Sequence, residues 1–183
     1  QKSPEVELEN YDVAVVRCKT YDVEAVKPAL EEAVNAVNGL DFVKPGMKII
    51  IKPNLVSFKK PDAAATTHPA LLEALVEMLL ARGAGVTIGD SPGGPHSLPL
   101  LNRVYAATGM DRLEKLGAKL NRNMNEKTVD FPEGKVLKNF TYTEYLDEAD
   151  AIIDFCKLKS HGMLGMSAAV KNLFGTIPGL KKQ

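Results

Sequence analysis

The stretch that decides the fold is Met47-Lys48-Ile49-Ile50-Ile51-Lys52-Pro53-Asn54. A strand is predicted over residues 47–52, and its unbroken apolar centre, Ile49-Ile50-Ile51, is typical of a parallel sheet whose two faces are both covered. Pro53 lacks a backbone N–H and ends such a strand, so Lys52 and Asn54 are expected at its carboxyl end. Because ligands of open parallel sheets bind outside the carboxyl ends of the strands, this stretch predicts both a fold class and a binding edge.

Two further strand-like runs also end in polar loops. Residues 86–88 lead into Gly89-Asp90-Ser91-Pro92-Gly93-Gly94-Pro95-His96, and residues 151–156 lead into Lys157-Leu158-Lys159-Ser160-His161-Gly162. The first strand is followed by Thr66-Thr67-His68-Pro69, so all three histidines of the chain lie in such loops. Loops at the carboxyl ends of parallel strands converge, and we therefore expect one composite site.

Helix-like segments alternate with these strands. Apolar residues at helical spacing predict helices over 23–37, 69–80, 97–107 and 167–174, with a helical turn over 111–116. Further strands are predicted over 13–16, 119–120 and, within an irregular segment from 121 to 145, over 136–140. This alternation favours an α/β fold: a mostly parallel sheet with helices on both faces, in three layers.

The domain organisation is expected to be simple. Residues 1–11 are polar and acidic and predict a disordered or extended tail, whereas residues 12–183 predict a single α/β domain. The chain stops soon after its last loop motif without a closing element, which suggests part of a longer domain.

Composition excludes several classes of function. The 183 residues hold 23 Lys plus Arg and 23 Asp plus Glu, so the basic excess of nucleic-acid-binding proteins is missing. No apolar stretch approaches the ~20 residues that cross a bilayer, and no signal-peptide pattern is found. We therefore expect a cytoplasmic protein, although the start at Gln1 leaves a processed or exported form open.

The cysteines predict no metal cluster. Cys18 and Cys156 lie far apart and form no C-x-x-C pair, so the chain cannot by itself complete a zinc knuckle or an iron–sulphur cluster. The cofactor is therefore unknown from the sequence.

Two of the loops favour an anionic ligand. Lys52, beside Asn54, can neutralise a phosphate or carboxylate; the alternative is a lysine that extends into solvent. In the second loop Gly93 and Gly94 let backbone N–H groups approach a ligand, although the spacing matches no nucleotide-binding motif. The alternative for that loop is a tight turn closed by a local side chain.

Thr66, Thr67 and His68 precede Pro69 at an expected helix start. Capping accounts for one threonine and leaves the other threonine and the histidine unexplained. Helix starts favour anions, so we expect these residues to contact the ligand, with capping alone as the alternative.

The segment Lys157-Leu158-Lys159-Ser160-His161 is the richest in ionisable groups. If the strand continues through Lys159, Lys157 and Lys159 share a face. Imidazole titrates near neutrality, which suits His161 to act as a base or a metal ligand. A solvated basic turn is the alternative. Lys171 and Asn172 follow on the next helix and face either the same crevice or the surface.

Taken together, these segments resemble the family called domain of unknown function 362. The resemblance is carried by residues 51–56 (Ile-Lys-Pro-Asn-Leu-Val), 66–69 (Thr-Thr-His-Pro), 89–94 (Gly-Asp-Ser-Pro-Gly-Gly), 157–161 (Lys-Leu-Lys-Ser-His) and 169–175 (Ala-Val-Lys-Asn-Leu-Phe-Gly). It implies a shared site at these residues but no established reaction. It also implies occurrence in anaerobic bacteria and archaea, continuation into further α/β structure, and, in many members, a ferredoxin-like domain with two four-iron clusters.

Three functions are compatible with these residues. The first is a small-molecule enzyme, redox-associated by the resemblance alone, in which an anion is bound and His161, Asp90 and Lys159 are catalytic. The second is a non-catalytic binding or accessory module for an iron–sulphur or ferredoxin-like partner. The third, ranked last, is a metal site of His68, Asp90 and His161. The residues expected to bind the ligand are Lys52, Asn54, Thr66, Thr67, His68, Ser91, Gly93, Gly94, Lys157, Lys171 and Asn172.

Overall fold

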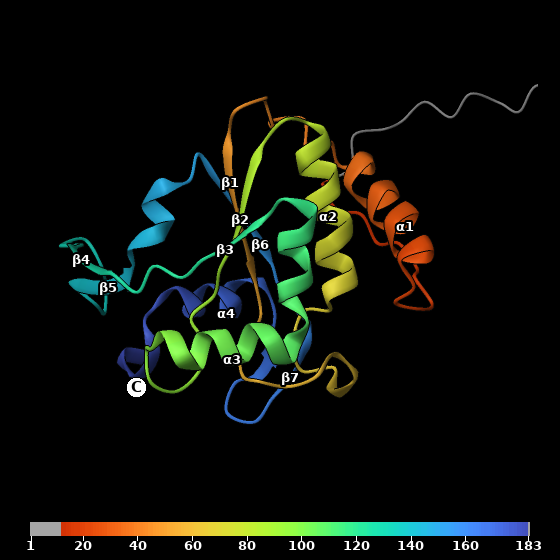
Figure 1. The fold of residues 1–183 in the computed structure, drawn as a ribbon. Coiled ribbons are helices and arrows are strands. Elements are labelled where there is room, and N and C mark those ends of the chain that lie inside the picture. The colour runs from red at the N-terminus through yellow and green to blue at the C-terminus, as the bar shows by residue number, and fades with distance from the viewer. Residues whose placement is uncertain (1–11, 183) are drawn as a thin grey trace, which may run out of the picture.

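A four-stranded parallel sheet forms the centre of the chain in this computed structural model, which describes residues 12–182. The strands are β1 (Lys48–Pro53), β2 (Gly85–Ile88), β3 (Lys119–Leu120) and β6 (Ala151–Phe155), in the order β3-β2-β1-β6 (Figure 1). All four were predicted, and the α/β fold class is confirmed. The tail predicted over residues 1–11 lies outside the described residues.

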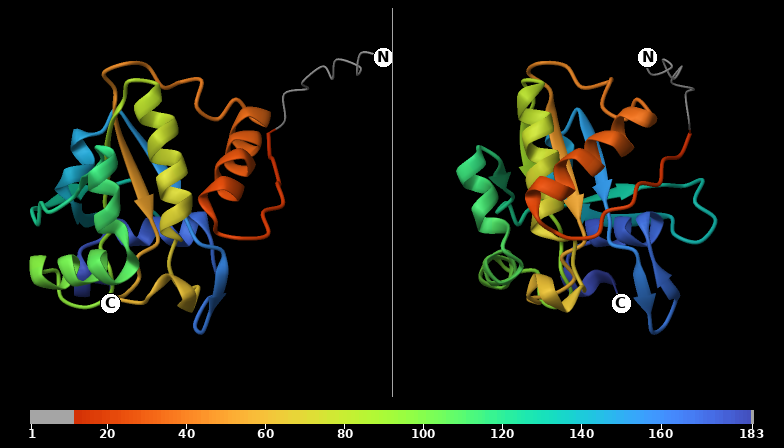
Figure 2. Two further views of the ribbon diagram at one scale, coloured as in Figure 1. Left: turned by 45° about the vertical axis from the view of Figure 1, so that its right-hand side comes forward. Right: turned by 90° about the vertical axis from the view of Figure 1, so that its right-hand side faces the viewer.

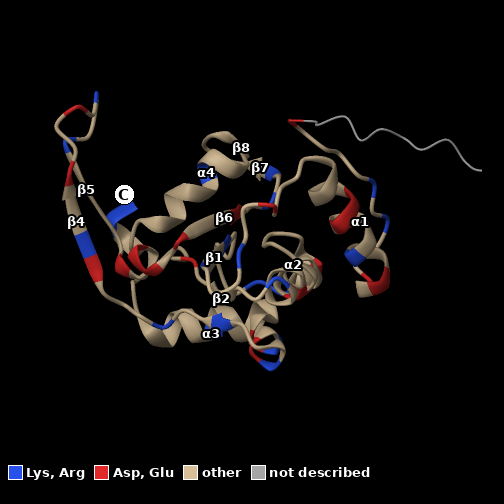
Figure 3. Ribbon diagram, turned by 90° about the horizontal axis from the view of Figure 1, so that it is seen from above, with Lys and Arg blue, Asp and Glu red and all other residues tan. Residues whose placement is uncertain are grey.

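One face of the sheet carries the main hydrophobic core. Ile49 and Ile51 of β1 point to α2 (Pro69–Ala81) and are buried with its Leu72, Val76 and Leu79. Helix α1 (Val23–Ala36) packs on the outside of α2, so this side is two helices deep (Figure 3). Figure 3 also shows acidic and basic residues interspersed over the elements, which agrees with the balanced net charge.

The opposite face has a thinner cover. Ile50 of β1 is buried there, whereas Ile152, its register partner on β6, remains 45% exposed. The cover consists of a 3-10 helix, Glu144–Glu148, and of the short α4 (Ala169–Leu173), which packs against β6. Helices therefore lie on both faces, as predicted, but to unequal extents.

The remaining elements gather beyond the carboxyl ends of the strands. Helix α3 (Leu98–Thr108), α4, and the hairpin of β7 (Lys159–His161) and β8 (Gly165–Ser167) lie past these ends (Figure 2). Short 3-10 helices complete the chain at Pro61–Ala63, Met110–Leu116, Phe174–Thr176 and Gly179–Lys182. Among the helices of residues 12–182, none combines the length and hydrophobicity that crossing a membrane requires.

Two of the predicted strands were wrong. Residues 13–16 are not a strand, and Val15 is 94% exposed, because β-branched residues form a strand only beside a hydrogen-bonded neighbour. In place of a single strand over 136–140 there is an antiparallel hairpin of β4 (Glu126–Asp130) and β5 (Asn139–Thr143). β5 alternates polar and aromatic residues, but β4 is mostly polar, and Pro132 and Gly134 between them interrupt the pattern.

The last central strand does not continue to Lys159. β6 ends at Phe155, whose carbonyl oxygen accepts a hydrogen bond from the Thr67 hydroxyl, and β7 belongs to a different sheet. Lys157 and Lys159 therefore do not share the face of one strand. The helix predicted over 167–174 is shorter, since Ser167 ends β8 and α4 begins at Ala169.

Candidate functional site

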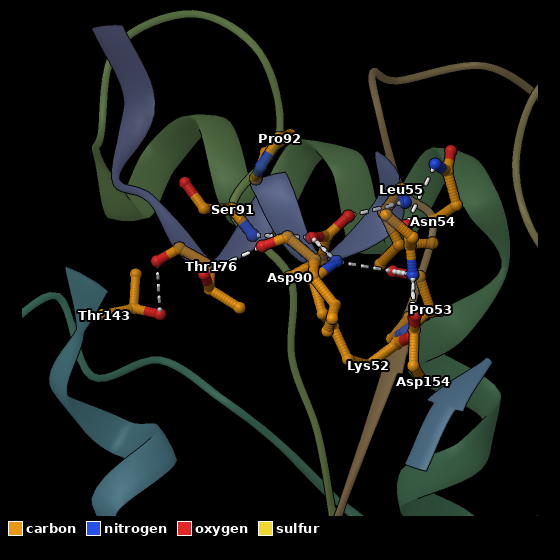
Figure 4. Close-up of polar contacts among 12 residues, drawn as sticks. Lys52, Pro53, Asn54, Leu55, Asp90, Ser91, Pro92, Thr143, Asp154 and Thr176 are labelled. Carbon is orange, nitrogen blue, oxygen red and sulfur yellow. Dashed lines mark hydrogen bonds and ion pairs between the residues drawn. The ribbon is translucent and has the colours of Figure 1, made fainter. Parts of the chain in front are cut away.

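The site is built on a buried ion pair between two strand ends. Lys52, at the end of β1, is fully buried, and its Nζ lies 2.7 Å from Oδ1 of Asp90 (Figure 4). Asp90 also accepts hydrogen bonds from the backbone N–H groups of Ser91, at 3.0 Å, and Leu55, at 2.7 Å. The two charges offset each other, so this pair holds the loops after β1 and β2 together.

Gly175 lies directly against this ion pair. Its carbonyl oxygen accepts a hydrogen bond from the Ser91 N–H at 3.0 Å. A Cβ atom at this position would lie 2.6 Å from Lys52 Nζ, so no other residue fits without displacing the pair. Gly175 was not among the predicted site residues, because a glycine just after a helix is usually explained as a helix end.

A chain of hydrogen bonds joins four elements beside the ion pair. Asn172 of α4 is buried, and its Nδ2 donates to the Lys52 carbonyl oxygen at 3.2 Å and to Asp154 Oδ1. Its Oδ1 accepts from Asn54 Nδ2 at 3.0 Å, and Asn54 Oδ1 accepts from Lys159 Nζ at 2.8 Å. The structure thus brings four of the predicted residues, Lys52, Asn54, Lys159 and Asn172, into one network.

The pKa values of two side chains in this network are shifted from their ordinary values. Burial raises the pKa of Asp154, whose Oδ2 is buried without a hydrogen-bond partner among the described residues. Burial also lowers the pKa of Lys159, and the nearby Lys157 and Lys171 act in the same direction. Both shifts weaken the charged form of the side chain.

The two threonines belong to the frame of the site. Thr67 Oγ1 accepts from the Asn54 N–H at 2.9 Å and donates to the Phe155 carbonyl oxygen at 2.9 Å, which ties the β1 loop to the end of β6. Thr66 is buried, and its hydroxyl finds no partner within residues 12–182.

The histidines predicted for the site lie outside its pocket. His68 caps α2, since its Nδ1 accepts from the Ala70 N–H at 3.2 Å, and its ring stacks on Tyr21 with centroids 3.9 Å apart. Burial lowers the pKa of His68. His161 lies at the β7–β8 turn, where its Nδ1 accepts from the N–H groups of Met163 and Leu164.

Other residues predicted for the site lie away from the network or have backbone groups that are already bonded. Lys157 Nζ lies 3.1 Å from the Tyr21 hydroxyl, away from the network of Lys159. The N–H of Gly93 is bonded to the Val56 carbonyl oxygen at 3.1 Å, so it is not free to hold a ligand as expected. Over residues 12–182 there is no group of three His, Cys, Asp or Glu side chains that could hold a metal ion.

A pocket of about 120 Å³ lies where these loops meet α4. A cavity needs about 10–15 Å³ of such volume to hold one water molecule, so the pocket has room for several waters or for one phosphate or carboxylate group. Six predicted residues line it, together with four that were not predicted. The lining residues are Asn54, Val56, Asp90, Ser91, Gly93, Lys171, Asn172, Phe174, Gly175 and Lys182.

Lys182 is the main residue that sequence reasoning missed. Its Nζ donates to the carbonyl oxygens of Ser91 and, at 3.2 Å, Pro92. Burial, together with the nearby charges of Lys52 and Lys171, lowers the pKa of Lys182 to about 8, although Asp90 opposes the shift. Lys182 is 91 residues from Ser91 in the sequence, and no local pattern connects the two.

The comparisons with known proteins agree with the resemblance seen in the sequence. The profile of the family described as "Domain of unknown function (DUF362)" matches residues 49–183. The chain belongs to the DUF362 family. The matched region of this DUF362 domain contains every residue of the pocket and its network.

One similar curated protein is the thylakoid-associated protein sll1697 of Synechocystis sp. It is 29% identical over 178 residues, and the match covers 93% of this chain and 52% of that protein. The chain therefore spans about half the length of this relative. No solved structure is significantly similar to the chain.

Proposed function

We propose that this DUF362 domain binds a small anionic group, a phosphate or a carboxylate, in the 120 Å³ pocket between the loops after β1 and β2 and α4. The observation that carries the proposal is the charge of the lining. Lys171 and Lys182 both line the pocket, whereas the acidic lining residue, Asp90, is already paired with Lys52. The pocket thus holds positive charge that the described chain does not neutralise.

The surroundings of Lys182 support this proposal. Its acceptors among the described residues are neutral oxygens of Ser91 and Pro92, and its lowered pKa reflects burial near other cations. An anion beside Lys182 would favour the charged ammonium and offset the desolvation.

The donors to the anion are expected to be side chains. The N–H groups of Ser91 and Gly93 are bonded within the protein, but the Ser91 hydroxyl accepts from the Gly179 N–H at 3.0 Å and retains its own hydrogen for donation. Charge-assisted hydrogen bonds from Lys171 and Lys182 would supply most of the affinity.

Binding has better support than catalysis. Asp90, expected to move a proton, has both carboxylate oxygens engaged, and His161 does not line the pocket. Lys159 is bound to Asn54 at the far side of the network. An iron–sulphur partner, implied by the resemblance, stays a prediction, and cytoplasmic localisation does as well.

Calorimetric titration with inorganic phosphate at pH 7 tests the proposal. The Lys182→Ala variant should bind phosphate about tenfold more weakly than the wild type, because a charged hydrogen bond is lost. Lys181→Ala is the matched control, since Lys181 pairs with Glu126 and does not line the pocket. Absence of phosphate binding by the wild type, or equal loss in both variants, would overturn the proposal.

A further inference from the structure

An apolar groove of about 580 Å³ lies on the surface formed by α4 and the β7–β8 hairpin. Leu164, Met166 and Val170 line it, and their side chains remain exposed, Val170 to 88%. An exposed group of large apolar side chains around one groove is typical of a binding surface, because solvation of such a surface is unfavourable.

This apolar groove adjoins the anion pocket. Lys171 and Phe174 line both cavities, and Lys171 Nζ lies 5.2 Å from the centre of the Phe174 ring. A ligand that follows this surface therefore passes from apolar side chains on one side to two lysines on the other. Neither the small pocket nor the groove alone would select such a molecule.

We propose that the ligand of this site is an amphiphilic anion: a phosphate or carboxylate head in the pocket and a single hydrocarbon chain along the apolar groove. This inference rests on the proposed function, since the head is the anion of that proposal. The volume of the groove lies within the range of about 300–1,000 Å³ found for small-molecule sites. Charge complementarity orients the molecule, with its head toward Lys182.

The ligand is a single molecule bound from solution and not part of a bilayer. The pocket that takes the head lies between the loops after β1 and β2 and α4, and its volume of about 120 Å³ suits a single phosphate or carboxylate group. Burying a methylene group fully raises affinity about fourfold. Because the groove is open along one side, we expect about a twofold gain for each carbon.

The experiment is a titration of the chain with n-alkyl phosphates from methyl to octyl, kept below the concentration at which they form micelles. Affinity should rise steadily with chain length above that of inorganic phosphate. A Leu164→Ser, Val170→Ser double variant should bind octyl phosphate about tenfold more weakly than the wild type does. Its affinity for inorganic phosphate should equal that of the wild type. Val136→Ser is the matched control, because Val136 is also 88% exposed but does not line the groove.

Each outcome is decisive. If inorganic phosphate binds and every alkyl phosphate binds equally, the amphiphile is overturned and the anion site remains. If none of them binds, both proposals fail. If the double variant keeps the rise in affinity with chain length, the hydrocarbon binds elsewhere and the inference is overturned. The inference is also overturned if the wild type sediments as a dimer while the double variant is a monomer. The same holds if the wild type binds anionic vesicles but not the monomeric phosphates.

Discussion

Lys52 Nζ and Asp90 Oδ1 lie 2.7 Å apart although 38 residues separate them in the sequence. Both side chains are buried, at 0% and 5% exposure, so each charge depends on the other for compensation. The ion pair is therefore a structural requirement of the proposed anion site, because it fixes the two loops that form the pocket wall.

Removing one member of this pair should destabilise the fold. For Lys52→Met we expect the free energy of unfolding to fall by about 3–5 kcal/mol, because Asp90 is left buried and unpaired. Urea unfolding followed by circular dichroism measures the change. Lys127→Met, which breaks the exposed pair with Asp147, should change stability little and serves as the control. Equal effects of the two substitutions would contradict a structural role for the buried pair.

Gly175→Ala should disturb the same pair by steric overlap. The added methyl would lie 2.6 Å from Lys52 Nζ, and overpacking of this kind costs about 1–3 kcal/mol. Thermal unfolding should show a lower midpoint, with weaker phosphate binding. Gly162→Ala, in the β7–β8 turn, is the control, because nothing lies within 4 Å of its added Cβ. If Gly175→Ala leaves both quantities unchanged, the contact is not tight in solution.

The sequence predicted the features that depend on neighbouring residues. The isoleucine run of β1 predicted a buried parallel strand, and the polar residues after it predicted the edge where Asn54 and Asn172 meet. These inferences needed only strand direction and the rule that ligands bind at carboxyl ends.

Features set by contacts distant in the sequence were missed. Nothing near Lys182 indicates that it folds back onto Ser91, and nothing near His68 indicates that its ring stacks on Tyr21. A histidine in a loop can cap, stack or catalyse, and only its three-dimensional neighbours decide which. For this reason the sequence predicted that polar residues at the strand ends lie together, but it could not show that His68 and His161 lie outside the pocket.

Asp154→Asn should stabilise the protein at neutral pH. Burial raises the folded-state pKa of Asp154 above its ordinary value of 3.8, so the folded protein binds more protons than the unfolded chain between these two pKa values. The unfavourable contribution of Asp154 is absent below 3.8, grows as pH rises through the window, and is complete above the folded pKa. Asparagine is neutral and its oxygen can still accept from Asn172. Unfolding midpoints at pH 4 and pH 7 measure the effect, and a variant less stable than wild type at pH 7 would contradict it.

Lys182 should give the stability of the protein a distinct dependence on alkaline pH. Its folded-state pKa is about 8, below the ordinary 10.5, so between these values the unfolded chain binds more protons than the folded one. The unfavourable contribution is complete below pH 8 and disappears as pH rises to 10.5, so stability should increase over this window relative to Lys182→Met. The difference in unfolding midpoint between wild type and Lys182→Met, measured from pH 7 to 10.5, isolates this group from others that titrate there. Phosphate binding should weaken over the same rise, because the neutral amine no longer attracts the anion; affinity independent of pH from 7 to 10 would contradict a role for Lys182.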